Sequence, residues 1–137
     1  MSNGILERCN TIEESYEFML AYAAKGLPSD EGSNPGTQIR EFLQRAADAM
    51  AGLAQSCTSA VKDEGFAPDE KYHAFFAVLD RDARDSLAAI ELVLSQPSIS
   101  SQLVDNLNAS IHLRALLTDL FLVGEIMRSR ARSRSVR

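Results

Sequence analysis

Apolar residues recur at spacings of three and four along almost the whole chain, and no useful stretch alternates apolar with polar residues. Such spacing places apolar side chains on one face of an α-helix. Breaks rich in glycine, proline and serine divide the pattern into about four long segments. We therefore predict an all-α protein, an antiparallel (up-down) four-helix bundle with a long fourth helix and a short disordered basic C-terminal tail.

The first predicted helix begins near Thr11, because Thr11-Ile12-Glu13-Glu14 matches a capping box. The apolar stripe that precedes it, from Ile5, is either an extra turn or a continuation of the same helix. Gly26 is a favourable residue just after a helix end, and Pro28 follows where a helix cannot continue. The segment 26–36 is rich in turn residues and is predicted to be the longest loop.

The second predicted helix runs from about 35 to 65 and the third from 68 to 96, each opening on a proline suited to a first helical turn. The fourth begins between 98 and 101, where several hydroxyl groups can cap it. Because the hinge at Pro97 is short, we expect these last two helices to form an antiparallel hairpin. The fourth helix spans about 50 Å and is expected to project beyond the bundle.

The positive charge is concentrated at the end of the chain. The net charge is −5, and five of the fourteen basic residues are arginines of the last ten positions: Arg128, Arg130, Arg132, Arg134 and Arg137. The first 127 residues therefore carry a net charge of −10. We predict a helical bundle domain at 1–127 and an Arg/Ser-rich flexible tail at 128–137. An acidic body argues against broad nucleic-acid binding by the fold itself.

The five tail arginines are the predicted partner-binding residues. An arginine–serine segment is typical of an electrostatic arm that contacts RNA, DNA or an acidic protein surface. Two alternatives remain, a frayed solubilising tail and an arm folded onto the acidic body. The second requires close contact, because salt screens charges over about 8 Å. Nucleic acid is a possible partner only through this tail, and the protein partner is unknown.

The segment 113–127 is apolar around most of its helical circumference. A helix of this kind is either central in a bundle or buried at a subunit interface. We therefore predict a homodimer, which a strictly monomeric mass at tens of micromolar would refute. The predicted dimer interface consists of Leu113, Leu116, Leu117, Leu120, Phe121, Val123 and Met127.

Metal chemistry is the alternative. Glu70 and His73 stand three apart on one helix face, a spacing that di-iron bundles use twice. The second pair is missing, because Ala109 stands three residues before His112. The alternative function is therefore a small-ligand or metal-binding bundle, with or without enzymatic activity, that uses Glu70, His73 and His112. The simpler interpretation makes His73 a surface residue of a first helical turn.

His112 also invites comparison with histidine phosphotransfer domains, which are four-helix bundles with one reactive histidine. The residues after it, Leu113-Arg114-Ala115-Leu116, lack the Lys-Gly expected there. A bundle-edge histidine bonded to a carboxylate is the simpler interpretation. The loop segment Ser33-Asn34-Pro35-Gly36-Thr37 precedes a helix and could bind an anion, although these residues are also ordinary caps.

Cys9 and Cys57 fall on apolar stripes, where a thiol is inert. No nucleophile elbow, phosphate-binding glycine loop or dinucleotide fingerprint occurs. No signal peptide or apolar span of membrane length is apparent, so we expect a cytoplasmic protein with no membrane partner. The overall prediction is a non-enzymatic interaction, adaptor or regulatory bundle without a cofactor.

Overall fold

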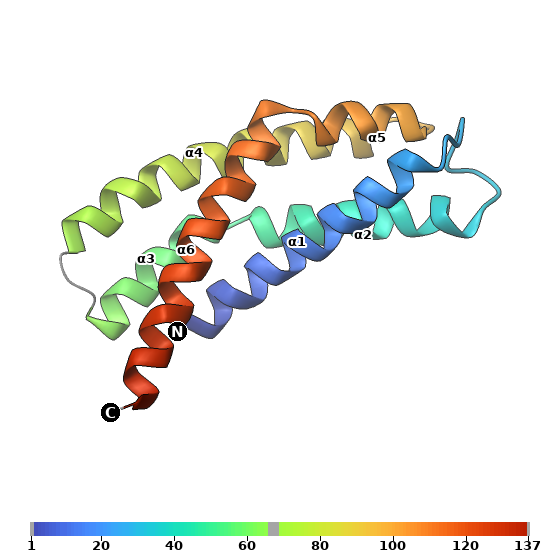
Figure 1. Cartoon of the computed structure of the whole chain (residues 1–137). Helices are drawn as coiled ribbons and strands as arrows, with labels where there is room; N and C mark the ends of the chain where they lie inside the picture. Colours follow the sequence, from blue (N-terminus) through green and yellow to red (C-terminus); the bar gives the residue numbers. More distant parts are fainter. Residues whose placement is uncertain (1, 66–68, 137) are drawn as a thin grey trace.

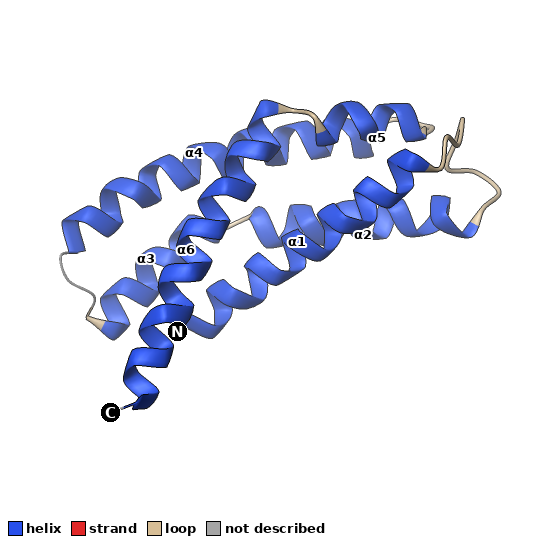
Figure 2. Cartoon of the chain, viewed as in Figure 1, coloured by secondary structure: helices blue, strands red, loops and turns tan. Residues whose placement is uncertain are grey.

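The computed structural model describes residues 2–65 and 69–136, and helices make up nearly all of both ranges (Figures 1 and 2). Neither range contains a strand, which confirms the predicted all-α class. The helices of these ranges are α1 (Ser2–Ala24), α2 (Asn34–Met50), α3 (Leu53–Glu64), α4 (Asp69–Leu94), α5 (Ser101–Asn108) and α6 (Ile111–Val136). The predicted start of one helix at Pro68 lies outside the described residues.

The helices pack as a bundle in which two of the four predicted segments are broken. α1 and α4 each contact the same four helices, α2, α3, α5 and α6. α2 and α3 together replace the second predicted helix, and α5 and α6 replace the fourth (Figure 1). The structure therefore has six helices in its described part, where the sequence pattern indicated about four.

Every helix contributes to one apolar core. Fully covered side chains come from each of them, among them Ile12, Leu43, Leu53, Leu79, Val104 and Leu116. Complete burial of such a side chain stabilises the fold by about 1.5–3 kcal/mol. None of the helices in the described ranges is long and apolar enough to cross a membrane.

The first helix begins earlier than its capping signal indicates. Ile5 and Cys9 are completely buried, so the apolar stripe before Thr11 continues the helix instead of leading into it. The backbone oxygen of Thr11 accepts a hydrogen bond from Ser15 Oγ at 2.8 Å, which places Thr11 inside the helix. Of the two alternatives left by the sequence, the continuation is therefore the one observed.

The break between α2 and α3 depends on a glycine and an arginine. Gly52 has φ of 75°, a left-handed conformation that other residues rarely adopt. The carbonyl groups left free at the end of α2 are satisfied by Arg8 of α1, whose Nη1 donates to Ala49 O at 3.0 Å and to Ala51 O at 2.8 Å. A side chain from α1 thus fixes the bend in its neighbour.

The break between α5 and α6 contains neither glycine nor proline. Asn108 is buried, and its Nδ2 donates to Met19 O of α1 at 3.1 Å. Ser110 then starts α6, because its Oγ accepts the backbone N–H of His112 at 3.2 Å. A long-range contact and a local cap therefore end one helix and begin the next.

The basic end of the chain is helical in the structure, which differs from the predicted disordered tail. α6 continues to Val136, and its end projects past the start of α1 (Figure 1). Arg128 is half-buried and folds back along the helix, with its Nη2 3.2 Å from the position that a Cβ on Gly124 would occupy. Burial of the arginine stem gives this segment packing contacts that a purely polar tail would lack.

Candidate functional site

The predicted metal-ligating residues are not brought together. His73 lies in the first turns of α4 and is exposed, as the simpler interpretation expects. His112 of α6 lies beside Asp85 of α4. Asp85 is twelve residues after His73 on α4, a distance of about 18 Å at the rise of an α-helix. Glu70, one turn before His73, is farther still from Asp85 along α4. Among the described residues, no group of three potential metal ligands occurs.

His112 occupies the bundle edge. Its Nδ1 lies 3.9 Å from Asp85 Oδ2, and both side chains are about half exposed. Its backbone oxygen accepts a hydrogen bond of 2.8 Å from Ser86 Oγ of α4. The arrangement matches the expected edge histidine beside a carboxylate, and it fastens the start of α6 to α4.

Both cysteines are core residues, as predicted. Cys9 and Cys57 are completely buried and unbonded. Burial raises the pKa of Cys9 to about 11 and that of Cys57 to about 12. Because the thiolate is the nucleophilic form, these thiols are poor nucleophiles in the folded protein.

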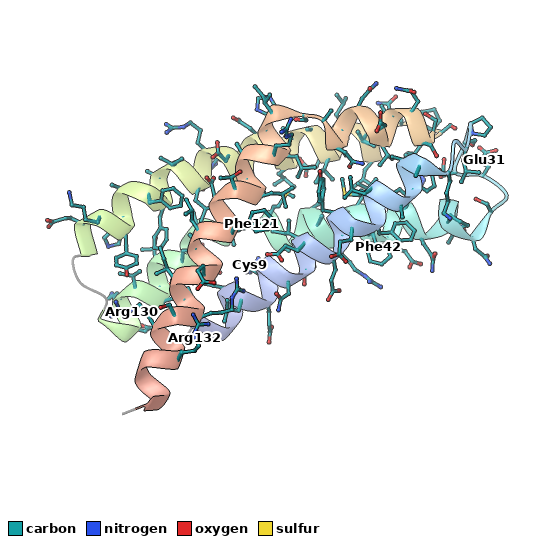
Figure 3. All side chains as sticks on the ribbon, viewed as in Figure 1. Cys9, Glu31, Phe42, Phe121, Arg130 and Arg132 are labelled. Atoms are coloured by element: carbon teal, nitrogen blue, oxygen red, sulfur yellow. The ribbon has the colours of Figure 1, made fainter. Side chains whose placement is uncertain are left out.

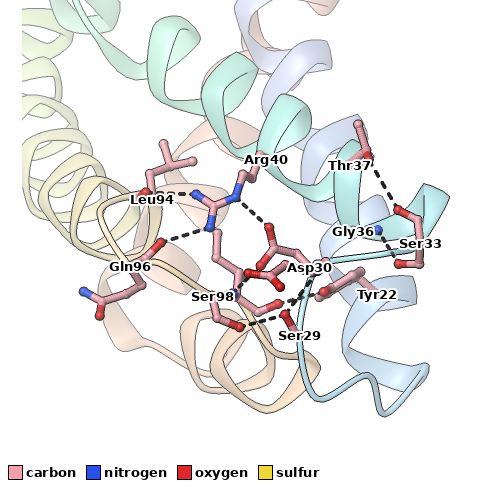
Figure 4. Close-up of polar contacts among 12 residues, drawn as sticks. Tyr22, Ser29, Asp30, Ser33, Gly36, Thr37, Arg40, Leu94, Gln96 and Ser98 are labelled. Carbon is pink, nitrogen blue, oxygen red and sulfur yellow. Dashed lines mark hydrogen bonds and ion pairs between the residues drawn. The ribbon is translucent and has the colours of Figure 1, made fainter.

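The loop after α1 is a structural clasp (Figure 4). Arg40 of α2 binds Asp30 through Nε at 2.7 Å, and it also donates to Leu94 O and Gln96 O at the end of α4. Asp30 Oδ1 accepts the backbone N–H of Ile99 at 2.7 Å. These contacts join the loop to the turn before α5, and we call them the Asp30–Arg40 clasp.

Further polar contacts at the same end of the molecule join α1 to the start of α5. Tyr22 donates through its hydroxyl group to Ile99 O at 2.7 Å, and Ser101 Oγ donates to Tyr22 O at 2.6 Å. Ser33 caps α2 by accepting the Gly36 N–H at 3.1 Å. The backbone donor at the proposed anion position is therefore already used, which favours the ordinary capping role.

An open depression of about 360 Å³ lies where α1 meets the start of α3, and Arg8, Gly52 and Ser56 are among its lining residues. Among its described lining residues the cationic one, Arg8, is engaged with the carbonyl groups that end α2. The arginine thus has a structural role at the bend.

Most of the predicted dimer-interface residues lie in the core of the single chain. The residues of that set that are at most 6% exposed are Leu113, Leu116, Leu117, Leu120, Val123 and Met127. Contacts with α1, α4 and α5 already cover them. Phe121 alone of the predicted set is exposed, at 56%.

Phe121 belongs to a small apolar surface on the outside of α6. Leu122 and Ile126 are 52% and 41% exposed, and all three side chains lie within two turns of one another. We call these three residues the outer strip. Other exposed large apolar residues are Leu20 on α1, Val78 and Leu92 on α4, and Ile111 at the start of α6. Among the described residues, the outer strip therefore brings the largest number of exposed large apolar side chains within two turns of one helix.

The tail arginines differ in their surroundings. Arg128 and Arg130 are half-buried, and Arg132 forms an ion pair of 3.1 Å with Glu125 on the same helix. Figure 3 shows Phe121 partway along α6 and Arg130 and Arg132 near its end. The side chain of Arg134 and the whole of Arg137 lie outside the described part. The described arginines form a helical basic end rather than a free arm.

A buried acid is the feature that sequence reasoning missed. Asp119 interrupts the apolar run of α6, which the pattern marks only as a polar break. The structure buries it beside Asp82 of α4, although Asp82 belongs to a charged stretch that is typical of a solvated face. An acid on the buried half of a helical wheel was the signal available in the sequence.

Comparison with protein-family models, with curated proteins and with solved structures gives no match. The function must therefore be inferred from the geometry of the chain itself.

Proposed function

We propose that this protein is a non-enzymatic interaction module that binds an acidic amphipathic helix of a partner protein along the outer strip of α6. The observation that carries the proposal is the exposure of Phe121, Leu122 and Ile126, each at least two-fifths exposed within about one and a half turns of α6. Leu122 and Ile126 stand four residues apart, and apolar side chains at this spacing form a ridge against which a second helix packs. Exposed apolar patches on single chains often mark such contacts.

The charge distribution supports an acidic partner. α6 contains five arginines and two acidic residues, whereas residues 1–110 contain eight basic and seventeen acidic residues. Arg114 precedes the outer strip and is exposed, and Arg132 follows it. A partner helix with acidic residues beside its apolar face would find complementary charge on α6 and repulsion elsewhere.

A second copy of the chain is the less favourable occupant. The outer strip offers an area on the order of 300 Å², compared with roughly 800 Å² per partner in a standard stable interface. The arginines near it bring positive charge from both copies to the same place.

A fluorescent peptide tests the proposal directly. The probe is a fourteen-residue helix-forming peptide with leucine at helical spacing and glutamate on its flanks, and its binding is followed by fluorescence anisotropy. We expect the double variant Leu122→Ser, Ile126→Ser to bind at least about tenfold more weakly. Leu92→Ser removes a leucine of α4 that is more exposed than Leu122, and it is the control, with unchanged binding.

Three outcomes contradict the proposal. One is equal loss of binding in the Leu92→Ser control. Another is equal or tighter binding of a peptide that carries lysine in place of glutamate. The third is a dimeric mass of the unmodified protein that the double variant abolishes, since a second copy then occupies the outer strip.

A further inference from the structure

Asp119 is the one acidic side chain that is buried among the residues whose burial the structure describes. It is 6% exposed, and its Oδ2 is completely covered and accepts no hydrogen bond. An ionised carboxylate in this position loses its water without gaining a donor in exchange. A neutral carboxyl group avoids that cost, so the position favours a protonated Asp119.

Asp82 supplies the group with which a protonated Asp119 can interact. It lies on α4, which packs against α6, and its carboxyl group is within hydrogen-bonding reach of Asp119. Two ionised carboxylates have no hydrogen to share and repel each other. With one proton between them, the protonated group donates to its ionised neighbour.

The charged residues that flank Asp82 in sequence are engaged or exposed. Arg84 binds Asp80 at 2.8 Å, and Asp85 lies beside His112. Arg81 is exposed. In the described part of the molecule, the charge that acts on Asp119 comes from Asp82.

The described residues of the other helices packed against α6 place no cation beside Asp119 either. On α1, Cys9 and Glu13 lie near Arg128, which is more than two turns of α6 beyond Asp119. Tyr16 of α1 is a half-buried phenol, and Asp105 of α5 is exposed. On α6 itself, Glu125 is paired with Arg132 and His112 with Asp85.

We propose that Asp82 and Asp119 share a single proton across the contact between α4 and α6, and that losing this proton weakens the packing of α6 on α4. The inference is independent of partner binding to the outer strip.

The direction of the pH dependence follows from the two states of the chain. Burial, and then the hydrogen bond to Asp82 and its negative charge, raise the pKa of Asp119 to about 7. In the unfolded chain the same group loses its proton near pH 4. Between these values the folded protein holds one more proton than the unfolded chain, so stability falls as the pH rises from about 4 to 7 and then levels off.

The test measures urea unfolding at pH 5.5 and pH 8. A His112→Gln background is used, so that no ionisable imidazole lies beside Asp85 in either measurement. In that background we expect the unfolding constant to increase roughly thirtyfold between the two pH values. Adding Asp119→Asn should reduce the increase below about threefold, because the amide donates to Asp82 at every pH.

Two further measurements make the test specific. Asp105→Asn, an exposed substitution on α5, is the matched control and should retain the roughly thirtyfold increase. Carbon-13 NMR of aspartate carboxyl groups in the unmodified protein should show one resonance that titrates near neutral pH and is absent from the Asp119→Asn variant. Asp82→Asn should move that titration to lower pH.

The proposal is overturned if the His112→Gln protein shows less than a threefold change in its unfolding constant. It is also overturned if Asp119→Asn leaves the change intact. The NMR measurement decides the matter if a variant does not fold, since titration of Asp119 in the ordinary aspartate range excludes a shared proton.

Discussion

Asp30 and Asp119 are the same residue type in opposite electrostatic surroundings. Asp30, at the end of the molecule where α2 meets the turn after α4, binds Arg40 through one oxygen and the Ile99 N–H through the other. Asp119, between α4 and α6, faces another acid and has an oxygen without a donor. The hydrogen bond from Arg40 lowers the pKa of Asp30, whereas burial beside Asp82 raises that of Asp119.

The two regions therefore respond to pH in opposite directions. A carboxyl group whose pKa is lowered by folding contributes stability above the ordinary aspartate range, and that contribution disappears in acid. A carboxyl group whose pKa is raised makes the fold most stable at low pH and less stable towards neutrality. Depth of burial alone does not set the direction, because the donors within reach decide it.

The largest effect should come from breaking the Asp30–Arg40 clasp. Arg40→Ala leaves the Asp30 carboxylate without its cation and two carbonyl oxygens without their donor. We expect the free energy of unfolding in urea at pH 7 to fall by about 2–4 kcal/mol. Arg84→Ala breaks an exposed pair and is the control, with a loss below about 0.5 kcal/mol. Equal losses would remove the distinction between a structural clasp and a surface ion pair.

A smaller loss of unfolding free energy is expected from Asp30→Asn, and its pH dependence distinguishes Asp30 from other carboxylates. Asp30→Asn keeps the shape of the side chain but weakens the contact with Arg40, with an expected loss of about 1–2 kcal/mol at pH 7. The difference from the unmodified protein should shrink as the pH falls through the ordinary aspartate range, because Asp30 takes up its proton in the unfolded chain before it does so in the folded protein. Urea unfolding from pH 3 to 7 measures it, and a difference that stays constant across this range would contradict the assignment.

The smallest effect should come from the third carboxylate–arginine contact. Glu125 and Arg132 are mostly exposed, so water and salt weaken their attraction. Arg132→Ala should change the free energy of unfolding by less than about 0.5 kcal/mol, and a double-mutant cycle with Glu125→Ala should show a coupling of similar size. A coupling as large as that of the clasp would show that the end of α6 is more tightly packed than its exposure indicates.

The helical class and the position of the longest loop could be predicted because they depend on local signals. The spacing of apolar residues predicts the helices, and the glycine and proline residues of 26–36 predict the loop. Gly52 is a local signal for the bend between α2 and α3, but the alanine-rich sequence around it favours a continuous helix. The break after Asn108 has no such signal, because it depends on a hydrogen bond to Met19, eighty-nine residues away.

The candidate surface was harder to predict for a physical reason. α6 is apolar on several sides, and sequence spacing cannot decide which side its neighbours cover. The structure covers Leu116 and Leu120 and exposes Leu122. Similarly, the arginine–serine composition indicates disorder, while burial of Arg128 accompanies a helix that continues to Val136.

The buried cysteines have a consequence for kinetics. Cys9 on α1 and Cys57 on α3 are completely covered, so a thiol reagent can reach them only after the helices around them separate. The rates at which a reagent modifies these thiols therefore report how often the core opens, without any label added to the chain. These rates can be measured under native conditions, where the open state is too rare for spectroscopy to detect.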